Sequence, residues 1–248
     1  LILALVGVGS ISDIVDACEA VLRGEKYTSF KDKNTSELGG ERILTTADHT
    51  AYLKIAEGCD NKCTYCAIPL IRGNFRSRKI EDIVKEARDL EALGVKELNL
   101  IAQDTSRYGL DIYGEYSLAR LVREICKATD IPWIRLLYCY PDKITDELLE
   151  TMARQPKVLH YIDLPLQHAD DKILKAMNRR GDGAFLRETV RRIREALPDA
   201  VIRTTFIVGF PGEGEEEFEN LAVFVNETEF DRLGCFAFSP QEGTPAFD

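Results

Sequence analysis

Apolar residues recur along this chain in two rhythms. From about Thr50 onward, six short apolar runs typical of buried strands appear, and amphipathic segments with helical spacing lie between them. The runs are AYLKIAEG, ELNLIAQD, PWIRLLYCY, LHYIDLPLQ, VIRTTFIVGF and LGCFAFSP. Strands that alternate with helices predict a parallel sheet whose strands are joined by right-handed crossovers.

The amphipathic segments predict five helices, each with its apolar residues on one face. We expect them at 80–90, at 118–125 behind Ser117 as a cap, from Thr145 onward, from Asp182 or Gly183 onward, and at 218–225. Because a closed (β/α)8 barrel needs eight such units and typically about 250 residues, six units fit an open barrel better. The predicted fold is therefore α/β, an open three-quarter TIM-like (β/α)6 barrel, with a doubly wound sheet as the runner-up. Both folds place the chemistry at the carboxyl ends of the strands.

The first part of the chain follows a different pattern. Residues 11–22 have helical spacing, with Ile11, Ile14, Val15, Cys18 and Leu22 on one face. Residues 23–42 are polar and show no periodicity, which is typical of a linker or an edge extension. We interpret 1–45 as the remnant of a preceding domain plus a linker, and 46–248 as the barrel. The opening LILALVGVGS is interpreted as a strand inside a longer protein rather than a signal peptide.

Composition limits the classes of partner. The 248 residues carry a net charge of −10, and an acidic domain alone is poorly suited to gripping a phosphate backbone, so nucleic acid is not expected as its partner. No apolar run approaches the roughly 18 residues that span a membrane. The seven cysteines are odd in number and unevenly spread, which argues against a disulfide framework and predicts a reducing, cytoplasmic setting.

Three cysteines carry the strongest chemical signal. Cys59, Cys63 and Cys66 form C-x₃-C-x₂-C directly after the first predicted barrel strand. Structural zinc takes four ligands, usually as two pairs, and the chain has no second CxxC. A [4Fe–4S] cluster takes one thiolate per iron, so three thiolates would leave one iron open for a substrate or cofactor. We favour the cluster, with zinc or unligated thiols as alternatives. The remaining cysteines, Cys18, Cys126, Cys139 and Cys235, are interpreted as small buried hydrophobic residues.

With an aromatic residue before its last cysteine, this loop resembles the hallmark of the radical S-adenosylmethionine (SAM) superfamily. More narrowly, GCDNKCTYCAIPLIRGNFRSR resembles the methylthiotransferases, and similarity extends through LPLQH, MNRRGD and TTFIVGFPGE. NLIAQDTSRYG, IRLLYCYPDKITDELL and FSPQEGTPA look like the branch that acts on an aspartate of the twelfth small-subunit ribosomal protein. The branch that acts on transfer RNA is the first alternative, and a structural zinc scaffold without catalysis is the second.

The resemblance implies a set of site residues. Cys59, Cys63 and Cys66 would hold the cluster, with no catalytic residue beyond it, and Tyr65 would lie against the SAM adenine. The other implied cofactor contacts are Gln103, Asp104, Gln167, Arg203, Gly209, Phe210 and Pro211. A structural hydrogen bond is the favoured role for His168. For the basic NRRG of 178–181 both a solvated turn and a substrate contact are open.

The resemblance also implies a reaction. SAM bound to the open iron would be cleaved reductively, and a methylthio group would be inserted at the β-carbon of the aspartate. An electron donor is required. A second [4Fe–4S] cluster is expected in a domain that this chain lacks.

Overall fold

A six-stranded parallel sheet forms the centre of the molecule. The computed structural model describes residues 2–36, 38–40 and 42–247. The strands are β3 (Thr50–Lys54), β6 (Glu97–Ile101), β7 (Trp133–Leu136), β8 (Val158–Asp163), β9 (Val201–Val208) and β10 (Arg232–Ala237). Each overlaps one of the six predicted apolar runs, and every neighbouring pair is parallel. The predicted strands are confirmed.

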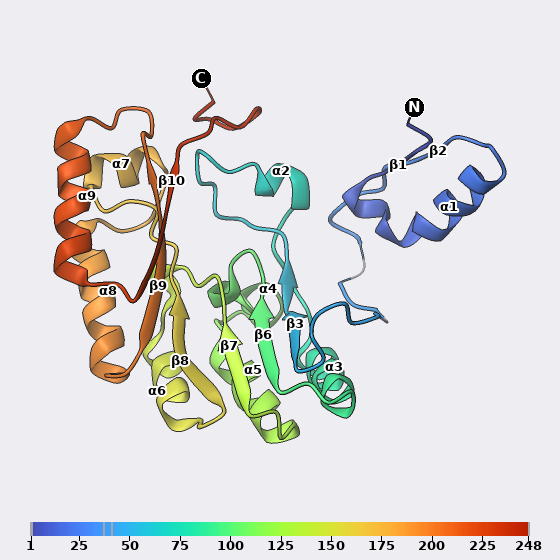
Figure 1. Cartoon of the computed structure of the whole chain (residues 1–248), viewed down its shortest axis with the longest axis horizontal. Coiled ribbons are helices and arrows are strands. Elements are labelled where there is room, and N and C mark those ends of the chain that lie inside the picture. Colours follow the sequence, from blue (N-terminus) through green and yellow to red (C-terminus); the bar gives the residue numbers. More distant parts are fainter. Residues whose placement is uncertain (1, 37, 41, 248) are drawn as a thin grey trace.

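The order of the strands identifies the architecture. Across the sheet they follow the chain, β3-β6-β7-β8-β9-β10, so β3 and β10 are the two edges. A doubly wound sheet would reverse its strand order at a switch point, and this sheet has no reversal. The predicted open barrel is therefore confirmed. Figure 1 shows the strands rising side by side toward the end of the molecule that carries α2.

The crossovers between strands contain the five predicted helices. These are α3 (Ile80–Ala92), α5 (Leu118–Ala128), α6 (Asp146–Arg154), α8 (Gly183–Ala196) and α9 (Glu215–Thr228). Each buries an apolar stripe, and α3 packs on α5, α5 on α6, and α6 on α8, in chain order. Thr145 caps α6 by accepting the Leu148 N–H at 3.1 Å. Ser117 precedes α5 but makes no capping hydrogen bond, because its hydroxyl donates to the carbonyl oxygen of Glu115.

The shorter elements follow the carboxyl ends of the strands. They are the antiparallel pair β4 (Ala56–Glu57) and β5 (Arg76–Ser77), the helices α2 (Ile68–Arg72), α4 (Leu110–Tyr113) and α7 (Asp171–Ala176), and the 3₁₀ turns Thr105–Arg107 and Pro141–Lys143. These segments build the site described below.

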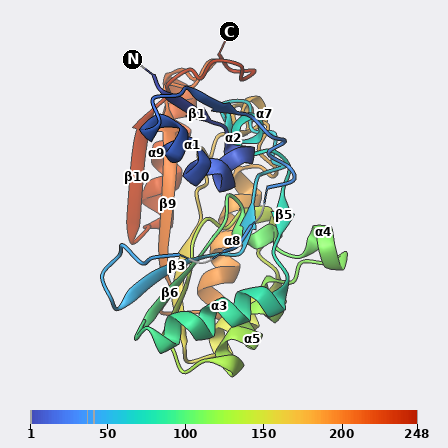
Figure 2. The ribbon, with the colours of Figure 1, turned by 90° about the vertical axis from the view of Figure 1, so that its right-hand side faces the viewer.

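A small unit precedes the barrel. It contains β1 (Ala4–Val6), a 3₁₀ segment Val8–Asp13, α1 (Ile14–Leu22) and β2 (Tyr27–Ser29), and β1 pairs in parallel with β2. Figure 2 shows α1 beside β1, at the end of the molecule toward which the barrel strands point. β2 lies within the segment expected to be a linker or an edge extension, and it pairs with β1 in a separate two-stranded sheet.

The predicted helix of 11–22 is present from Ile14, and its predicted apolar face is exposed rather than buried. Ile11 is 60%, Val15 63% and Leu22 87% exposed. The opposite face is buried and carries Ala17, Ala20 and Asp13, whose carboxylate accepts the Ser29 hydroxyl at 2.7 Å. A polar contact to the β2 side of the unit therefore orients the helix.

Two of the four cysteine predictions outside the loop were also wrong. Cys126 and Cys139 are buried as predicted, but Cys18 and Cys235 are exposed. Cys18 lies on the outer face of α1, and Cys235 lies on the edge strand β10, whose residues are mostly exposed. Of the helices that the structure describes, none combines the length and apolar character needed to cross a membrane.

Candidate functional site

A cavity of about 960 Å³ lies at the carboxyl ends of the strands. All three predicted ligands, Cys59, Cys63 and Cys66, line it. So do four of the predicted cofactor contacts, Tyr65, Gln103, Gln167 and Arg203. This volume is at the upper end of the range for small-molecule and cofactor sites. The segment 58–66, here called the cysteine loop, therefore faces a space large enough for a cluster and a bound nucleoside-type ligand together.

The cysteine loop depends on a glycine at its start. Gly58 has φ +79°, and a Cβ at this position would overlap the carbonyl oxygen of Asn74. The next residue, Cys59, donates its N–H to the Gly73 carbonyl oxygen at 3.1 Å, and the Cys66 N–H donates to the Cys63 carbonyl oxygen at 3.1 Å. The backbone thus turns sharply enough to bring three cysteines to one cavity.

The far side of the loop is held by residues from the end of α7. Thr64 Oγ1 donates to the Ala176 carbonyl oxygen at 2.8 Å, and Asn178 Nδ2 donates to the Lys62 carbonyl oxygen at 2.7 Å. The Ala246 N–H donates to the Thr64 carbonyl oxygen at 2.9 Å. Segments distant in sequence therefore fix the shape of the loop.

The thiols are largely shielded from solvent. Cys59 is 9% and Cys63 8% exposed, and burial raises the pKa of the Cys59 thiol to about 11 and that of Cys66 in the same direction. Among the described residues, no three His, Cys, Asp or Glu side chains converge as ligands of a single ion. A cubane makes a different demand on the protein, because it takes one thiolate at each of several irons.

An unpartnered acceptor in the cavity fits a ligand that donates hydrogen bonds. The Gln103 amide donates to Glu57 Oε1 at 3.1 Å, whereas its own Oε1 is buried without a partner among the described residues. Burial opposes ionisation of Glu57, but Lys54 and Arg72 hold its carboxyl pKa below the usual value. A buried acceptor without a partner costs about 1–3 kcal/mol, which a ligand donor would recover. The donor set and this acceptor fit a cluster with a bound amine.

Gln167 and Arg203 occupy neighbouring strand ends. Gln167 has φ +73°, rare for a non-glycine residue, and its backbone bridges to β9 through Thr205 and Ile207. The Arg203 side chain is 44% exposed, and its Nη1 lies 3.2 Å from Asp163 Oδ1. Its guanidinium has further N–H groups with which to bind a carboxylate.

The other predicted contacts lie away from the cavity lining. Asp104 is fully buried and bonded to Asn61, Ser106 and Lys143. Phe210 is buried beside Tyr65 with the ring centroids 6.4 Å apart, and Gly209 and Pro211 flank it outside the lining. A cofactor contact from these residues stays a prediction.

His168 is buried and contacts only protein groups among the described residues. It is fully buried, its Nδ1 accepts the Asp170 N–H at 3.0 Å, and its Nε2 lies 3.6 Å from Glu213 Oε1. Burial lowers the pKa of His168, so the ring is held neutral. This agrees with the structural role favoured from the sequence.

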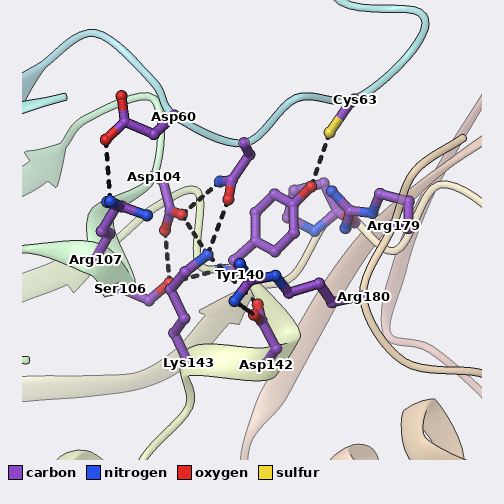
Figure 3. A network of polar contacts seen from close by, with 12 residues as sticks. Asp60, Cys63, Asp104, Ser106, Arg107, Tyr140, Asp142, Lys143, Arg179 and Arg180 are labelled. Atoms are coloured by element: carbon purple, nitrogen blue, oxygen red, sulfur yellow. Dashed lines mark hydrogen bonds and ion pairs between the residues drawn. The ribbon is translucent and has the colours of Figure 1, made fainter. Parts of the chain in front are cut away.

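Sequence reasoning missed a cluster of polar residues beneath the loop (Figure 3). The Tyr140 hydroxyl lies 2.8 Å from Cys63 Sγ. Two cations contact the Tyr140 ring, Lys143 with Nζ 4.1 Å and Arg179 with Cζ 3.8 Å from the ring centroid. Burial raises the pKa of Tyr140, which keeps the phenol protonated. The only signal in the sequence was that Tyr140 ends a predicted barrel strand.

Comparison with known proteins identifies the superfamily of the chain. The family model of the radical SAM superfamily matches residues 53–225. The ribosomal protein uS12 methylthiotransferase RimO of Alkaliphilus oremlandii is 57% identical over 205 residues, covering 83% of this chain and 47% of that protein. RimO of Clostridium tetani is 51% identical over 243 residues, covering 98% of this chain and 55% of that protein. The chain thus spans about half the length of these curated relatives.

A solved structure shares the fold. The radical SAM methyltransferase TsrM of Kitasatospora setae, with cobalamin and a [4Fe–4S] cluster bound, matches 80% of this chain and 38% of its own. The TM-score is 0.66 at 19% sequence identity, a likeness of fold alone.

Proposed function

The chain belongs to the radical SAM superfamily, and on that premise we propose that it is the SAM-cleaving barrel of a methylthiotransferase that modifies ribosomal protein uS12. The observation that carries the proposal is the placement of Cys59, Cys63 and Cys66 around one cavity at the strand ends. The names of the relatives support the choice of uS12 as substrate.

Different residues of the site are suited to hold the cluster and the parts of SAM. Cys59, Cys63 and Cys66 would hold a [4Fe–4S] cluster, with one iron left for SAM. Arg203 would pair with the SAM carboxylate and Gln103 Oε1 would accept from its amine. Tyr65 and Gln167, which also line the cavity, would contact the nucleoside. When bound, these cofactors supply hydrogen-atom abstraction from an unactivated carbon.

Burial shields part of the loop from water. Cys59, Cys63 and Tyr140 are each less than a tenth exposed, and the buried Phe210 ring lies edge-on to Tyr65 with centroids 6.4 Å apart. A dry site prevents side reactions of a reactive intermediate.

The finer assignment follows the family. The carbon attacked is the β-carbon of an aspartate in uS12, an electron donor reduces the cluster, and the reaction takes place in the cytoplasm. Cofactor contacts are also proposed for Asp104, Gly209, Phe210 and Pro211, as the family resemblance implies. A second [4Fe–4S] cluster, expected from the family, is proposed for the part of the relatives' length that this chain does not span.

Metal content is the first test. Iron, zinc and acid-labile sulfide are measured after anaerobic reconstitution of the chain, of Cys63→Ala, and of Cys235→Ala as the control. About four irons and four sulfides per chain in the wild type and control, lost in Cys63→Ala, support the proposal. About one zinc without sulfide contradicts it in favour of a structural scaffold.

Substrate choice needs the full-length enzyme. With SAM and a reductant, it is incubated with uS12 or with transfer RNA, and each product is examined by mass spectrometry. Addition of one methylthio group to an aspartate of uS12 supports the assignment. Modification of transfer RNA alone, with binding that weakens steeply as salt rises, contradicts it.

A further inference from the structure

We infer that Tyr140 and Arg179 are positioning residues that face the cluster at Cys63 and raise its reduction potential. Tyr140 supplies a hydrogen bond to the cysteine sulfur, and Arg179 supplies a buried positive charge. This inference rests on the proposed function, because it requires that Cys63 be a cluster ligand.

The hydrogen bond follows from geometry and from the chemistry of a ligating thiolate. The Tyr140 hydroxyl lies 2.8 Å from Cys63 Sγ, and within the described ranges it has no other hydrogen-bond partner. Either group could donate when Cys63 is a free thiol. A ligating cysteine has lost its proton, so in the loaded protein the phenol must be the donor.

Several contacts hold the Tyr140 ring in this position. Its backbone N–H donates to Ser106 Oγ at 2.8 Å, and Ser106 Oγ donates to Asp104 at 2.7 Å. Lys143 contacts the ring while its ammonium group pairs with Asp104 at 2.8 Å. The hydroxyl is therefore presented by a fixed ring (Figure 3).

Arg179 is distinguished by its missing counter-charge. It is only 8% exposed, its Nη2 donates to the Pro165 carbonyl oxygen at 2.6 Å, and no carboxylate of the described residues pairs with it. Its neighbour Arg180 has a side chain that is 72% exposed and lies 3.5 Å from Asp142. Burying an unpaired charge is strongly unfavourable. Three thiolates around a cluster beside Arg179 would supply the missing negative charge.

The two groups favour the reduced cluster for the same reason. Reduction adds one negative charge, and both a hydrogen bond to a cysteine sulfur and a nearby cation stabilise that charge. Both side chains are only 8% exposed, and charges in a buried environment are screened less than in water. Lys143 contributes less, because Asp104 already balances its charge.

The test is a redox titration of the reconstituted chain, monitored by electron paramagnetic resonance, without SAM. Tyr140→Phe and Arg179→Met are expected to keep the iron content and to shift the midpoint potential to more negative values. Arg179→Lys should restore part of the shift. The matched controls are Tyr108→Phe, which removes a buried hydroxyl that donates to the Arg78 carbonyl oxygen, and Arg180→Met. Both controls should keep the wild-type potential.

A second measurement keeps the inference testable if a variant fails to fold or to load. Electron–nuclear double resonance on the reduced wild-type protein should show an exchangeable proton coupled to the cluster, from the Tyr140 hydroxyl. Its absence in the wild type overturns the inference. So does an unchanged potential in both loaded variants. A wild-type chain that binds no cluster overturns the proposed function itself, which is a separate result.

Discussion

The carboxylate of Asp104 lies 2.8 Å from the ammonium nitrogen of Lys143, and the two side chains are 0% and 1% exposed. Asp104 follows β6, and Lys143 ends the turn after β7. Asn61 of the cysteine loop joins them, donating to Asp104 at 2.6 Å and accepting from Lys143 at 3.2 Å. One buried ion pair therefore ties two strand ends to the loop that carries the proposed ligands.

Breaking this pair should destabilise the fold. Lys143→Met leaves the Asp104 carboxylate buried without its cation, and we expect the free energy of unfolding to fall by about 3–5 kcal/mol in urea titrations. Lys143→Met combined with Asp104→Asn should recover part of the loss. Arg154→Ala, which breaks an exposed pair with Glu150, should change it by only about 0–1 kcal/mol. Equal effects of the two single substitutions would contradict the buried-pair interpretation.

Gly58 should be irreplaceable for two separable reasons. Gly58→Ala forces a side chain into a positive-φ conformation and into the Asn74 carbonyl oxygen, and it should abolish iron loading. Gly94 has φ +93°, but an added Cβ would meet no atom within 4 Å, so Gly94→Ala carries only the conformational cost of about 1–2 kcal/mol. Iron content and urea unfolding of both variants are the measurements. Full iron content in Gly58→Ala would contradict the expected clash.

Alkylation should divide the cysteines outside the loop into two pairs. Cys18 and Cys235 are exposed and should react quickly with iodoacetamide in the native protein. Cys126 and Cys139 are buried, burial raises the pKa of both thiols, and they should react slowly. Mass spectrometry after brief labelling reports each site, and labelling in guanidinium should reach all seven cysteines. Native Cys139 reacting as fast as Cys235 would be inconsistent with this structure.

Acid should weaken the contact between α7 and α9. The hydrogen bond from Lys172, together with the Gly214 N–H, lowers the pKa of Glu217 from 4.5 to about 2. A lowered carboxyl pKa adds stability above pH 4.5 that is lost as pH falls toward about 2. The stability difference between wild type and Glu217→Gln should therefore shrink across that window. A carboxyl midpoint near 4.5 for Glu217 in NMR titrations would refute the contact.

The barrel could be predicted because its signal is repeated. Each strand is an apolar run, each crossover carries an amphipathic helix, and the order of units along the chain is the order in the sheet. The position of the cysteine loop could be predicted too, because Cys59, Cys63 and Cys66 directly follow the first barrel strand.

The supporting residues could not be predicted, because nothing local distinguishes them. Arg179 and Arg180 are adjacent in NRRG, yet one is 8% exposed and the other's side chain 72%. Lys143 lies in a polar turn that looks solvated, and it is buried only because Asp104 arrives from another strand. Exposure on α1 also depends on tertiary contacts, since Ala17 and Ala20 are buried whereas the larger Val15 and Leu22 are exposed.

The contacts that shape the cysteine loop also determine when, during translation, the loop can take its final shape. The Asn178 side chain that holds the Lys62 carbonyl oxygen lies 116 residues further along the chain. At about 5–20 residues per second of translation, the loop leaves the ribosome on the order of ten seconds before this support exists. During that interval the three thiols belong to an unfinished barrel, open to oxidation and to competing metals. Cluster delivery is therefore best timed after the fourth strand and α7 have joined the sheet.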